Sequence, residues 1–390
     1  MVTAVLPRAD WTQRADLIQL VAVLGAGNAR YVGGAVRDTL LGIAVKDVDI
    51  ATPLRPLKVI GKLKDAGIQA VPTGIDHGTV TAVLPGGAVE ITTLRHDVST
   101  DGRRATVAFA DEWQDDAARR DFTINALYAD PATGEVFDWF GGLEDLAARR
   151  VRFIGDARQR IREDHLRILR YFRFQARFGS QPVDTNSEMA CSDLAATLKG
   201  LSRERVGMEM MNLLSLPDPA PTVARMAELG VLAVILPEAK VAALTELIVQ
   251  EDRQNVAPDA LRRLAALLPA DVPLAESVAS RFRLSGAQKK RLALAAARDG
   301  REDAARPLAY RLGRDAALDR LLIAGADVAP LAGWDIPEFP LKGGEIVARG
   351  IKAGPEVARV LRAVEARWIA AGFDNAAIPA LLDAELAAPA

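Results

Sequence analysis

Two aspartates stand two positions apart in a short run that is typical of a β-strand. The run Lys46-Asp-Val-Asp-Ile50 contains Asp47 and Asp49, and side chains two positions apart on a strand point to the same face. Two close carboxylates repel each other unless a cation lies between them. Mg²⁺ favours carboxylate oxygens together with substrate phosphates. The pair therefore predicts a catalytic metal site for Mg²⁺, with Mn²⁺ as an alternative ion.

Two glycines precede this pair, where a strand-like run gives way to a helix-like one. Gly33 and Gly34 end the run Ala29-Arg-Tyr-Val-Gly-Gly34, and the following helical pattern stops at Gly42. Because glycines lack side chains, a triphosphate can approach backbone N–H groups near a helix N-terminus. Arg37, one turn later, could reach phosphate oxygens. A Gly-Gly turn alone or an Asp-x-Asp pair alone is common without a function, but the order and spacing of the two together predict a nucleotide site.

The Gly-Gly turn, Arg37 and the Asp pair resemble the first motif of the polymerase-beta-like nucleotidyltransferases. The closer resemblance is to the class II tRNA nucleotidyltransferase and bacterial poly(A) polymerase family, whose motif reads GG-x-x-R-D-x-x-L-G followed by D-x-D. This resemblance implies an α+β nucleotidyltransferase head with a mixed sheet, followed by all-α neck, body and tail domains. It implies a template-independent enzyme that adds CCA to the 3′ end of tRNA from CTP and ATP. Glu90, on a later strand-like run, is either a third catalytic carboxylate or a structural acid at a strand edge.

Three polar side chains follow in the run Arg119-Arg-Asp-Phe-Thr-Ile-Asn-Ala-Leu127, which resembles the family's second motif. Arg120, Asp121 and Asn125 offer a guanidinium, a carboxylate acceptor and an amide. The resemblance implies that they hold the phosphates and the ribose hydroxyls of a nucleotide. The alternative is a helix N-terminus with an ordinary Arg–Asp salt bridge.

The run Glu163-Asp-His-Leu-Arg-Ile-Leu-Arg-Tyr-Phe-Arg-Phe174 has an apolar and a polar stripe. The spacing predicts one continuous helix. Its apolar stripe would consist of Ile161, His165, Ile168, Phe172 and Ala176. A neighbouring polar ridge would consist of Asp164, Arg167 and Arg170. Taken alone, this ridge fits i,i+3 ion pairing on a solvated helix face.

The polar ridge also resembles the family's E-D-x-x-R motif. That resemblance implies that Glu163, Asp164 and Arg167 form an amino-acid template for the incoming base. A carboxylate can accept from the exocyclic amine of cytosine or adenine, and a guanidinium can donate to the ring acceptor beside it. Guanine and uracil present the opposite pattern, so such a template would reject them. Arg170 and Arg173 would lie further along, near the triphosphate or the RNA backbone.

Two more segments resemble parts of the family. The polar run 95–105, with Arg103 and Arg104, corresponds to a loop implicated in switching from C to A addition, which favours full CCA addition; the alternative is a plain exposed hairpin loop. The run Ser202-Arg-Glu-Arg-Val-Gly-Met-Glu-Met210 resembles the fifth motif. We interpret it as a helix that supports the neck by packing.

Composition limits the class of protein. Net charge is −2, from 49 Lys and Arg against 51 Asp and Glu, so an RNA-binding surface needs locally gathered cations, as in the arginine-rich run 149–177. The single cysteine excludes a disulfide partner within the chain, and three histidines exclude a His-rich phosphohydrolase site. No run reaches the roughly 18–20 apolar residues that span a membrane. A soluble, cytoplasmic protein is therefore expected.

The elements that must position these residues change character along the chain. Helical periodicity covers 15–24, and strand patterns cover 48–51, 79–84 and 88–94, the last two as a hairpin. After about residue 155 long amphipathic patterns replace the strands. We predict a head at 1–150, a helical neck with the template helix at 151–215, a helical body at 216–290 and an RNA-binding tail at 291–390.

Three rival functions share some of these features. A bacterial poly(A) polymerase has the same motifs but would add only A to many RNAs. A CC-adding or A-adding specialist would carry out only part of the reaction. A catalytically silent RNA-binding protein is the alternative from another class, and the intact pair of Asp47 and Asp49 speaks against it.

Overall fold

The computed structural model of the protein describes residues 4–100, 105–299, 302 and 304–387. The chain divides into two compact units, Met1–Pro237 and Glu238–Ala390. The division between these units falls at residue 237. The predicted boundaries at residues 150, 215 and 290 stay predictions. Among the described residues, no helix is long and apolar enough to cross a membrane.

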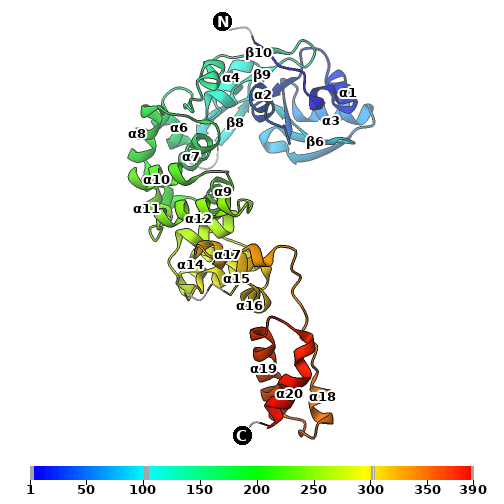
Figure 1. The fold of residues 1–390 in the computed structure, drawn as a ribbon. Coiled ribbons are helices and arrows are strands. Elements are labelled where there is room, and N and C mark those ends of the chain that lie inside the picture. The colour runs from blue at the N-terminus through cyan, green and yellow to red at the C-terminus, as the bar shows by residue number, and fades with distance from the viewer. Residues whose placement is uncertain (1–3, 101–104, 300–301, 303, 388–390) are drawn as a thin grey trace. The chain divides into compact units, whose positions relative to one another are not determined.

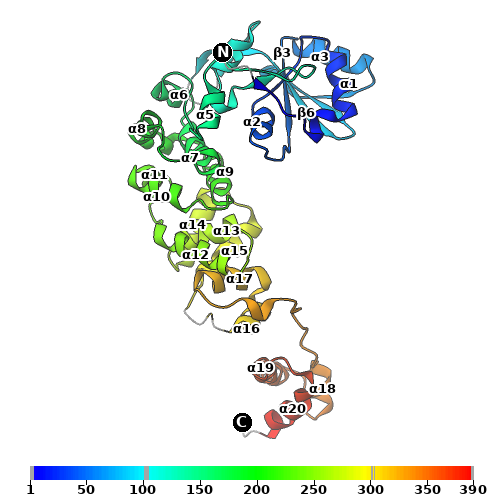
Figure 2. The same ribbon diagram turned by 45° about the horizontal axis from the view of Figure 1, so that its top comes forward.

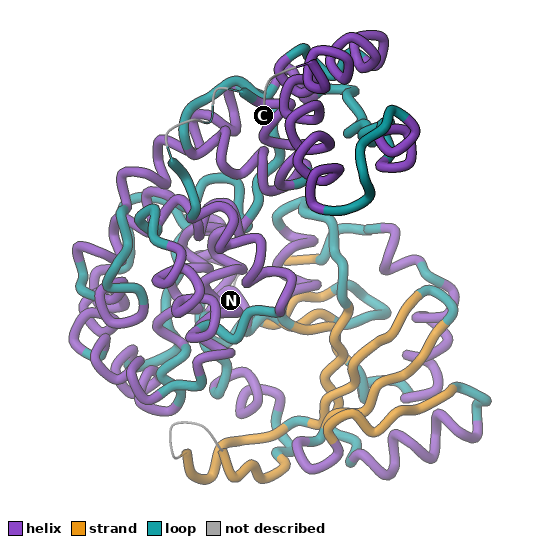
Figure 3. The backbone as a smooth tube through the Cα atoms, turned by 90° about the horizontal axis from the view of Figure 1, so that it is seen from below, coloured by secondary structure: helices purple, strands orange, loops and turns teal. Residues whose placement is uncertain are grey.

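The head is built on a mixed sheet (Figures 1 and 3). The sheet has eight strands in the order β1-β10-β9-β2-β3-β6-β5-β4. Strands β3 and β6 run parallel, and the other neighbouring pairs run antiparallel, so the predicted mixed sheet is confirmed. Strands β7 and β8 form a separate antiparallel ribbon. The strands are β1 (Ala4–Val5), β2 (Arg30–Val32), β3 (Val48–Thr52), β4 (Gln69–Gly74), β5 (Thr79–Leu84), β6 (Gly87–Thr93), β7 (Arg95–Thr100), β8 (Ala105–Phe109), β9 (Tyr128–Ala129) and β10 (Glu135–Phe137).

Alternating burial explains the hairpin of β5 and β6. Val80, Ala82 and Leu84 are buried while the residues between them are not, which is the period-two pattern of a strand with one face on a core. The predicted hairpin is confirmed by their antiparallel register. The predicted loop at 95–105 instead contains β7 and ends at the first residue of β8, and Arg103 and Arg104 lie outside the described residues.

Three helices pack around the site-bearing strands. Helix α1 (Ala15–Leu24) has the predicted bounds and lies beside α3 (Pro56–Asp65), as Figures 1 and 2 both show. Helix α2 (Gly34–Leu40) begins directly after β2 and contacts β2 and β3. The Gly-Gly turn and the strand with Asp49 are therefore held against each other.

The rest of the first unit is helical. The predicted single helix across the template run is wrong, because α6 ends at Glu163 and α7 begins at Arg167. Between them, Asp164 has an extended backbone, and its Oδ1 accepts the N–H of Leu166 at 3.1 Å, a local bond that competes with helix continuation. The helices are α4 (Trp113–Ala118), α5 (Gly142–Ala147), α6 (Ala157–Glu163), α7 (Arg167–Phe178), α8 (Thr185–Asp193), α9 (Arg203–Leu214), α10 (Ala220–Glu228) and α11 (Val231–Ile235).

The described part of the second unit contains helices and no strands. Its helical hairpins bury a charged group in which the two oxygens of Glu251 each accept from an arginine, Arg262 and Arg263, both at 2.8 Å. Trp368 lies at the centre of a separate apolar cluster. The helices are α12 (Val241–Arg253), α13 (Ala260–Leu267), α14 (Val272–Arg281), α15 (Gly286–Ala296), α16 (Ala305–Leu312), α17 (Arg314–Ile323), α18 (Gly343–Ala348), α19 (Pro355–Ala370) and α20 (Ile378–Ala387).

Candidate active site

Three carboxylates gather at the edge where β3 begins. Asp49 pairs in register with Glu90 on the parallel neighbour β6, and in-register residues point to the same face. Asp47 precedes β3 and is exposed. Burial first, and then the negative charges of Glu90 and Asp47, raise the pKa of Asp49, although the charge of Arg120 lowers it. The ionised acids repel one another, so a cation bound here would relieve that repulsion.

The acids fit a metal that also needs ligands from its substrate. Among the described residues, no group of three or more His, Cys, Asp or Glu side chains is arranged to hold a metal ion by itself. Asp47 and Asp49 offer the hard oxygen ligands that Mg²⁺ prefers, and Mg²⁺ sites commonly complete their coordination with phosphate oxygens and water. The donor set therefore fits a divalent ion that arrives with a nucleoside triphosphate. A role of Glu90 as a third metal ligand stays a prediction.

The Gly-Gly turn lies beside Arg120. Gly33 has φ +70° and ψ −123°, a backbone conformation open almost only to glycine. A Cβ added at Gly33 would lie 3.2 Å from a terminal nitrogen of Arg120. Gly34 is the first residue of α2, where backbone N–H groups are free of helical partners. The turn thus brings unshielded N–H groups and a guanidinium to one place, as an anion site requires.

Arg120 is anchored from behind by two side chains that sequence reasoning missed. Its Nε donates to the hydroxyl of Tyr128 at 3.0 Å, and a terminal nitrogen donates to Asp116 at 3.3 Å. Tyr128 in turn donates to Asp116. Burial alone would raise the pKa of Asp116, but the charges of Arg120 and Arg119 lower it to about 2. The i,i+4 spacing of Asp116 and Arg120 was the available signal.

Arg37 lies in the interior rather than at the surface of the turn. Its guanidinium donates to Asp38 at 2.7 Å and to the side-chain oxygen of Asn125, and it stacks over the ring of Phe178 at 4.1 Å. Asn125 donates to Asp121 at 3.0 Å. A direct contact of Arg37 with phosphate stays a prediction, and its present bonds tie α2 to the second motif and to α7.

Asp121 joins this motif to the neck. Its Oδ2 accepts from Arg170 of α7 at 2.7 Å. Burial raises the pKa of Asp121, but the charge of Arg170 and the hydrogen bonds from Asn125 and Arg170 outweigh burial and lower it. Arg173 donates to Glu209 of α9 at 2.6 Å. Four predicted nucleotide-binding residues therefore belong to a continuous polar network, namely Arg37, Asp121, Asn125 and Arg170.

The three predicted template residues lie together at the junction of α6 and α7. Arg167 donates to Glu163 at 2.6 Å and to the backbone oxygen of Arg119 at 3.1 Å. Asp164 instead forms an ion pair with Arg205 of α9, with 2.7 Å between the terminal nitrogen and Oδ2. Because Arg167 bonds the residue before Arg120, the template is linked directly to the segment that borders the acids.

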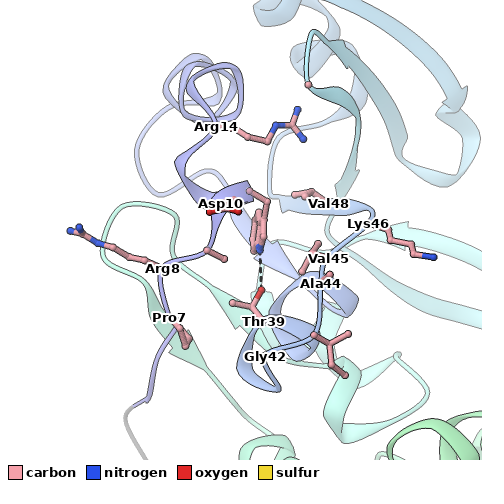
Figure 4. Close-up of a pocket in the computed structure, with 14 residues that line it drawn as sticks. Pro7, Arg8, Asp10, Arg14, Thr39, Gly42, Ala44, Val45, Lys46 and Val48 are labelled. Atoms are coloured by element: carbon pink, nitrogen blue, oxygen red, sulfur yellow. Dashed lines mark hydrogen bonds between the residues drawn. The ribbon is translucent and has the colours of Figure 1, made fainter.

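A pocket of about 690 Å³ is lined in part by the loop that leads to Asp47 (Figure 4). Lys46 and Val48, on either side of Asp47, line it, but neither Asp47 nor Asp49 does. The indole nitrogen of Trp11 donates to Thr39 at 3.0 Å across one wall. This bond ties the N-terminal segment to α2 and so supports the loop before Asp47.

Comparisons with known proteins agree with this geometry. Residues 29–152 match the poly A polymerase head domain family, and residues 182–242 match a family described as the probable RNA and SrmB-binding site of polymerase A. The mitochondrial CCA tRNA nucleotidyltransferase 1 of Mus musculus is 35% identical over 367 residues, which cover 88% of this chain and 83% of that protein. The CCA-adding enzyme of Latilactobacillus sakei is 42% identical over 188 residues, which cover 48% of this chain and 46% of that protein.

Solved structures extend the likeness to the fold. The Bacillus stearothermophilus CCA-adding enzyme in complex with CTP superposes with a TM-score of 0.72 at 28% identity, covering 94% of each chain. The Thermotoga maritima CCA-adding enzyme complexed with tRNA superposes with a TM-score of 0.73 at 20% identity, covering 99% of each chain. The site geometry, the matched head domain and the full-length likeness lead to one conclusion: the chain belongs to the CCA tRNA nucleotidyltransferase family.

Proposed function

We propose that this protein adds CCA to the 3′ end of tRNA, using CTP and ATP and releasing pyrophosphate. The observation that carries the proposal is that one segment, residues 119–120, lies beside the carboxylates and bonds a template residue. The acids at Asp49 and Glu90 lie beside Arg120, and the template residue Arg167 bonds the backbone of Arg119. A base read at the template would thus have its triphosphate near the acids.

A divalent metal ion is general in this family, and we assign Mg²⁺, replaceable by Mn²⁺, to Asp47 and Asp49. When bound, the ion offsets the charge of the triphosphate and of the oxygens that exchange at the α-phosphorus. Asp49 lies on β3 in register with Glu90, and burial followed by the negative charges of Glu90 and Asp47 raises its pKa, so a bound cation would favour its ionised form. Glu90 supplies a third negative oxygen on the same face of the sheet.

Phosphates are held by the turn and by Arg120. The N–H groups after Gly33 and the guanidinium of Arg120 offer donors with fixed directions, because Asp116 and Tyr128 hold that guanidinium from behind. Fixed donors stabilise charge in the transition state without reorganising during the reaction. The 3′ hydroxyl of tRNA then attacks the α-phosphorus, a bond forms from that oxygen to phosphorus, and the bond to the pyrophosphate oxygen breaks.

Asp164 and Arg167 choose the base in this proposal. The carboxylate accepts from N4 of cytosine or N6 of adenine, and the guanidinium donates to N3 and O2 of cytosine or N1 of adenine. Glu163 orients Arg167 through their 2.6 Å bond. Uracil and guanine would set an acceptor against the carboxylate, which leaves buried polar groups without partners and costs binding free energy.

Five residues are assigned to hold the phosphate-binding groups and the template residues in fixed positions relative to each other, namely Arg37, Asp121, Asn125, Arg170 and Arg173. Their hydrogen bonds, including that of Arg173 with Glu209, connect α2, the second motif, α7 and α9. In this role they position the nucleotide sites, and a misplacement of about 1 Å at such a distance from the chemistry can cost roughly a hundredfold in rate.

The test is single and combined incorporation of labelled CTP and ATP into a tRNA transcript that lacks its last three nucleotides. The proposal expects two C, then one A, then a stop, and no addition by an Asp49→Asn variant. Addition of C alone would make the protein a CC-adding enzyme, addition of A alone to a tRNA ending in CC an A-adding enzyme, and long A tracts on many RNAs a poly(A) polymerase. No incorporation with Mg²⁺ or Mn²⁺ would favour a silent RNA-binding protein.

Cytoplasmic location stays a prediction. The vertebrate relatives are named as mitochondrial proteins, so likeness to them does not favour the cytoplasm.

A further inference from the structure

Helix α9 faces the template junction with two charged residues one turn apart. Helices α7 and α9 pack side by side, as Figures 1 and 2 show. Arg205 and Glu209 are four positions apart and so share one face of α9. Arg205 bonds Asp164 before α7, and Glu209 bonds Arg173 on α7. The helix that sequence analysis treated as packing therefore contacts the template through polar side chains.

The contact at Asp164 involves both carboxylate oxygens. Oδ1 accepts the backbone N–H of Leu166 at 3.1 Å, and Oδ2 accepts from Arg205 at 2.7 Å. Asp164 lies between two helices with an extended backbone, and its backbone oxygen accepts the N–H of Arg167 at 3.0 Å. Within the described part of the chain, Arg205 is the side chain that bonds Oδ2.

Exposure shows why this orientation matters. The Asp164 side chain is 28% exposed and that of Arg205 is 31% exposed, so each remains open to solvent on one side. A base arriving at that side meets the lone pairs that the N–H of Leu166 and Arg205 leave unused. If the guanidinium were removed, the carboxylate could rotate about its side-chain torsions and present its oxygens in several directions.

We propose that Arg205 is a positioning residue that orients the Asp164 carboxylate and thereby sets the discrimination of cytosine and adenine against uracil and guanine. This inference depends on the proposed template role of Asp164. A fixed acceptor rewards a base that donates at N4 or N6 and penalises one that accepts at O4 or O6. A rotating carboxylate, or one bridged by water, distinguishes these bases less well because it adapts to either.

The experiment compares single-nucleotide addition of CTP, ATP, UTP and GTP by four full-length single variants and one double variant, Asp164→Ala with Arg205→Gln. Arg205→Gln removes the charge at similar size, Arg205→Lys keeps it, and Asp164→Ala removes the proposed template carboxylate. Arg203→Ala is the matched control, since Arg203 is exposed on the same helix and has no ion pair among the described residues. Thermal unfolding of each variant identifies a loss that comes from unfolding.

We expect Arg205→Gln to lower the ratio of kcat/KM for CTP over UTP about tenfold, the size expected for one partly exposed charge-assisted hydrogen bond. The change should come mainly from a higher KM for CTP and ATP. Arg205→Lys should recover most of the ratio, and Arg203→Ala should leave it unaltered. Adding Arg205→Gln to Asp164→Ala should cause no further loss of selectivity, since Arg205 acts through that carboxylate.

Three results would overturn the inference in distinguishable ways. If Asp164→Ala loses selectivity while Arg205→Gln keeps it, or loses kcat equally for all four nucleotides, Arg205 is not the positioning residue. If Asp164→Ala keeps wild-type selectivity, the template assignment itself fails and Arg205 falls with it. A further drop in the double variant would show that Arg205 acts independently of Asp164, which also contradicts the inference.

Discussion

The ion pair of Arg170 and Asp121 offers the sharpest test of how the second motif is held to the neck. The change is Arg170→Ala, which removes the guanidinium 2.7 Å from Oδ2 of Asp121. Asp121 keeps two bonds in the variant, from Asn125 at 3.0 Å and from the N–H of Phe122 at 2.9 Å. It loses its neighbouring opposite charge in a place where little water reaches it.

The magnitude follows from the burial of each partner. Removing one partner of a fully buried ion pair costs about 3–5 kcal/mol. Arg170 is 33% exposed and two hydrogen bonds to Asp121 survive, so the expected loss is smaller, about 2 kcal/mol. The matched control is Arg158→Ala on α6, whose partner Asp193 is 52% exposed. A surface pair of this kind contributes under about 1 kcal/mol.

The assay is urea unfolding at several pH values, combined with hydrogen exchange of peptides that cover residues 119–127. Because the folded-state pKa of Asp121 lies below its unfolded value, its contribution is present above the unfolded pKa and is lost as pH falls through the folded pKa. The difference between wild type and Arg170→Ala should therefore shrink below about pH 4. Equal losses for Arg170→Ala and Arg158→Ala, or unchanged exchange at 119–127, would refute the reasoning.

Three further predictions concern separate parts of the chain. Asp49→Asn should abolish nucleotide addition yet raise the melting temperature of the ligand-free protein near neutral pH. The pKa of Asp49 is raised in the folded protein, so its ionised form destabilises the fold there, and this cost vanishes as pH falls below the pKa of the unfolded state. Calorimetry that shows a lower melting temperature would contradict this prediction. Glu251→Gln should destabilise the second unit by about 3 kcal/mol, the lower end of the range for a broken buried ion pair, since it removes the carboxylate shared by Arg262 and Arg263 while Asp319 still pairs with Arg262. A loss below about 1 kcal/mol in urea unfolding would argue against it. Gly142→Ala should cost about 1–3 kcal/mol, because its Cβ would meet the backbone oxygen of Thr123 at 2.3 Å; a variant as stable as wild type in the same assay would show that the backbone moves freely.

Local periodicity accounts for the elements that the sequence predicted well. Helix α1 and strands β5 and β6 have buried faces with the period of their own conformation, and such patterns need no distant partner to be read. Strand β3 is a short run that is buried at every position except Asp49. Strands β1, β9 and β10 have two or three residues, too few for any period to appear. They exist because neighbouring strands pair with them, which is a property of the folded sheet.

The template run shows where periodicity misleads. Ile161, Ile168 and Phe172 are buried as a helical stripe requires, yet the helix is interrupted between them at Asp164. The apolar pattern survives because both helices bury these positions, while the side chain of Asp164 bonds the local backbone. Spacing alone does not record this competition between a side chain and the next helical hydrogen bond.

Residue types identified the chemistry of the site, but their partners came from the fold. The in-register pairing of Asp49 with Glu90 brings together the two carboxylates that the sequence singled out. Asp116 had only its i,i+4 spacing to Arg120 as a signal, and the motif that contains Arg205 and Glu209 did not indicate a bond with a site residue. Arg37 shows the converse case, because a position that suits phosphate binding in sequence is buried among protein partners in the structure.

The order of strands in the head has a consequence for synthesis on the ribosome. Strand β2, which ends at the Gly-Gly turn, lies between β3 and β9, and β9 is made only when the chain reaches Tyr128 and Ala129. Asp49 likewise gains its neighbour only after β6 has been made. A nascent chain thus contains the aspartates long before the nucleotide site is assembled, because β2 must first pair with β9 and β3 with β6, which are distant in sequence. Unfinished protein would bind nucleotide poorly, so the incomplete enzyme is kept from engaging its substrates while it is still being made.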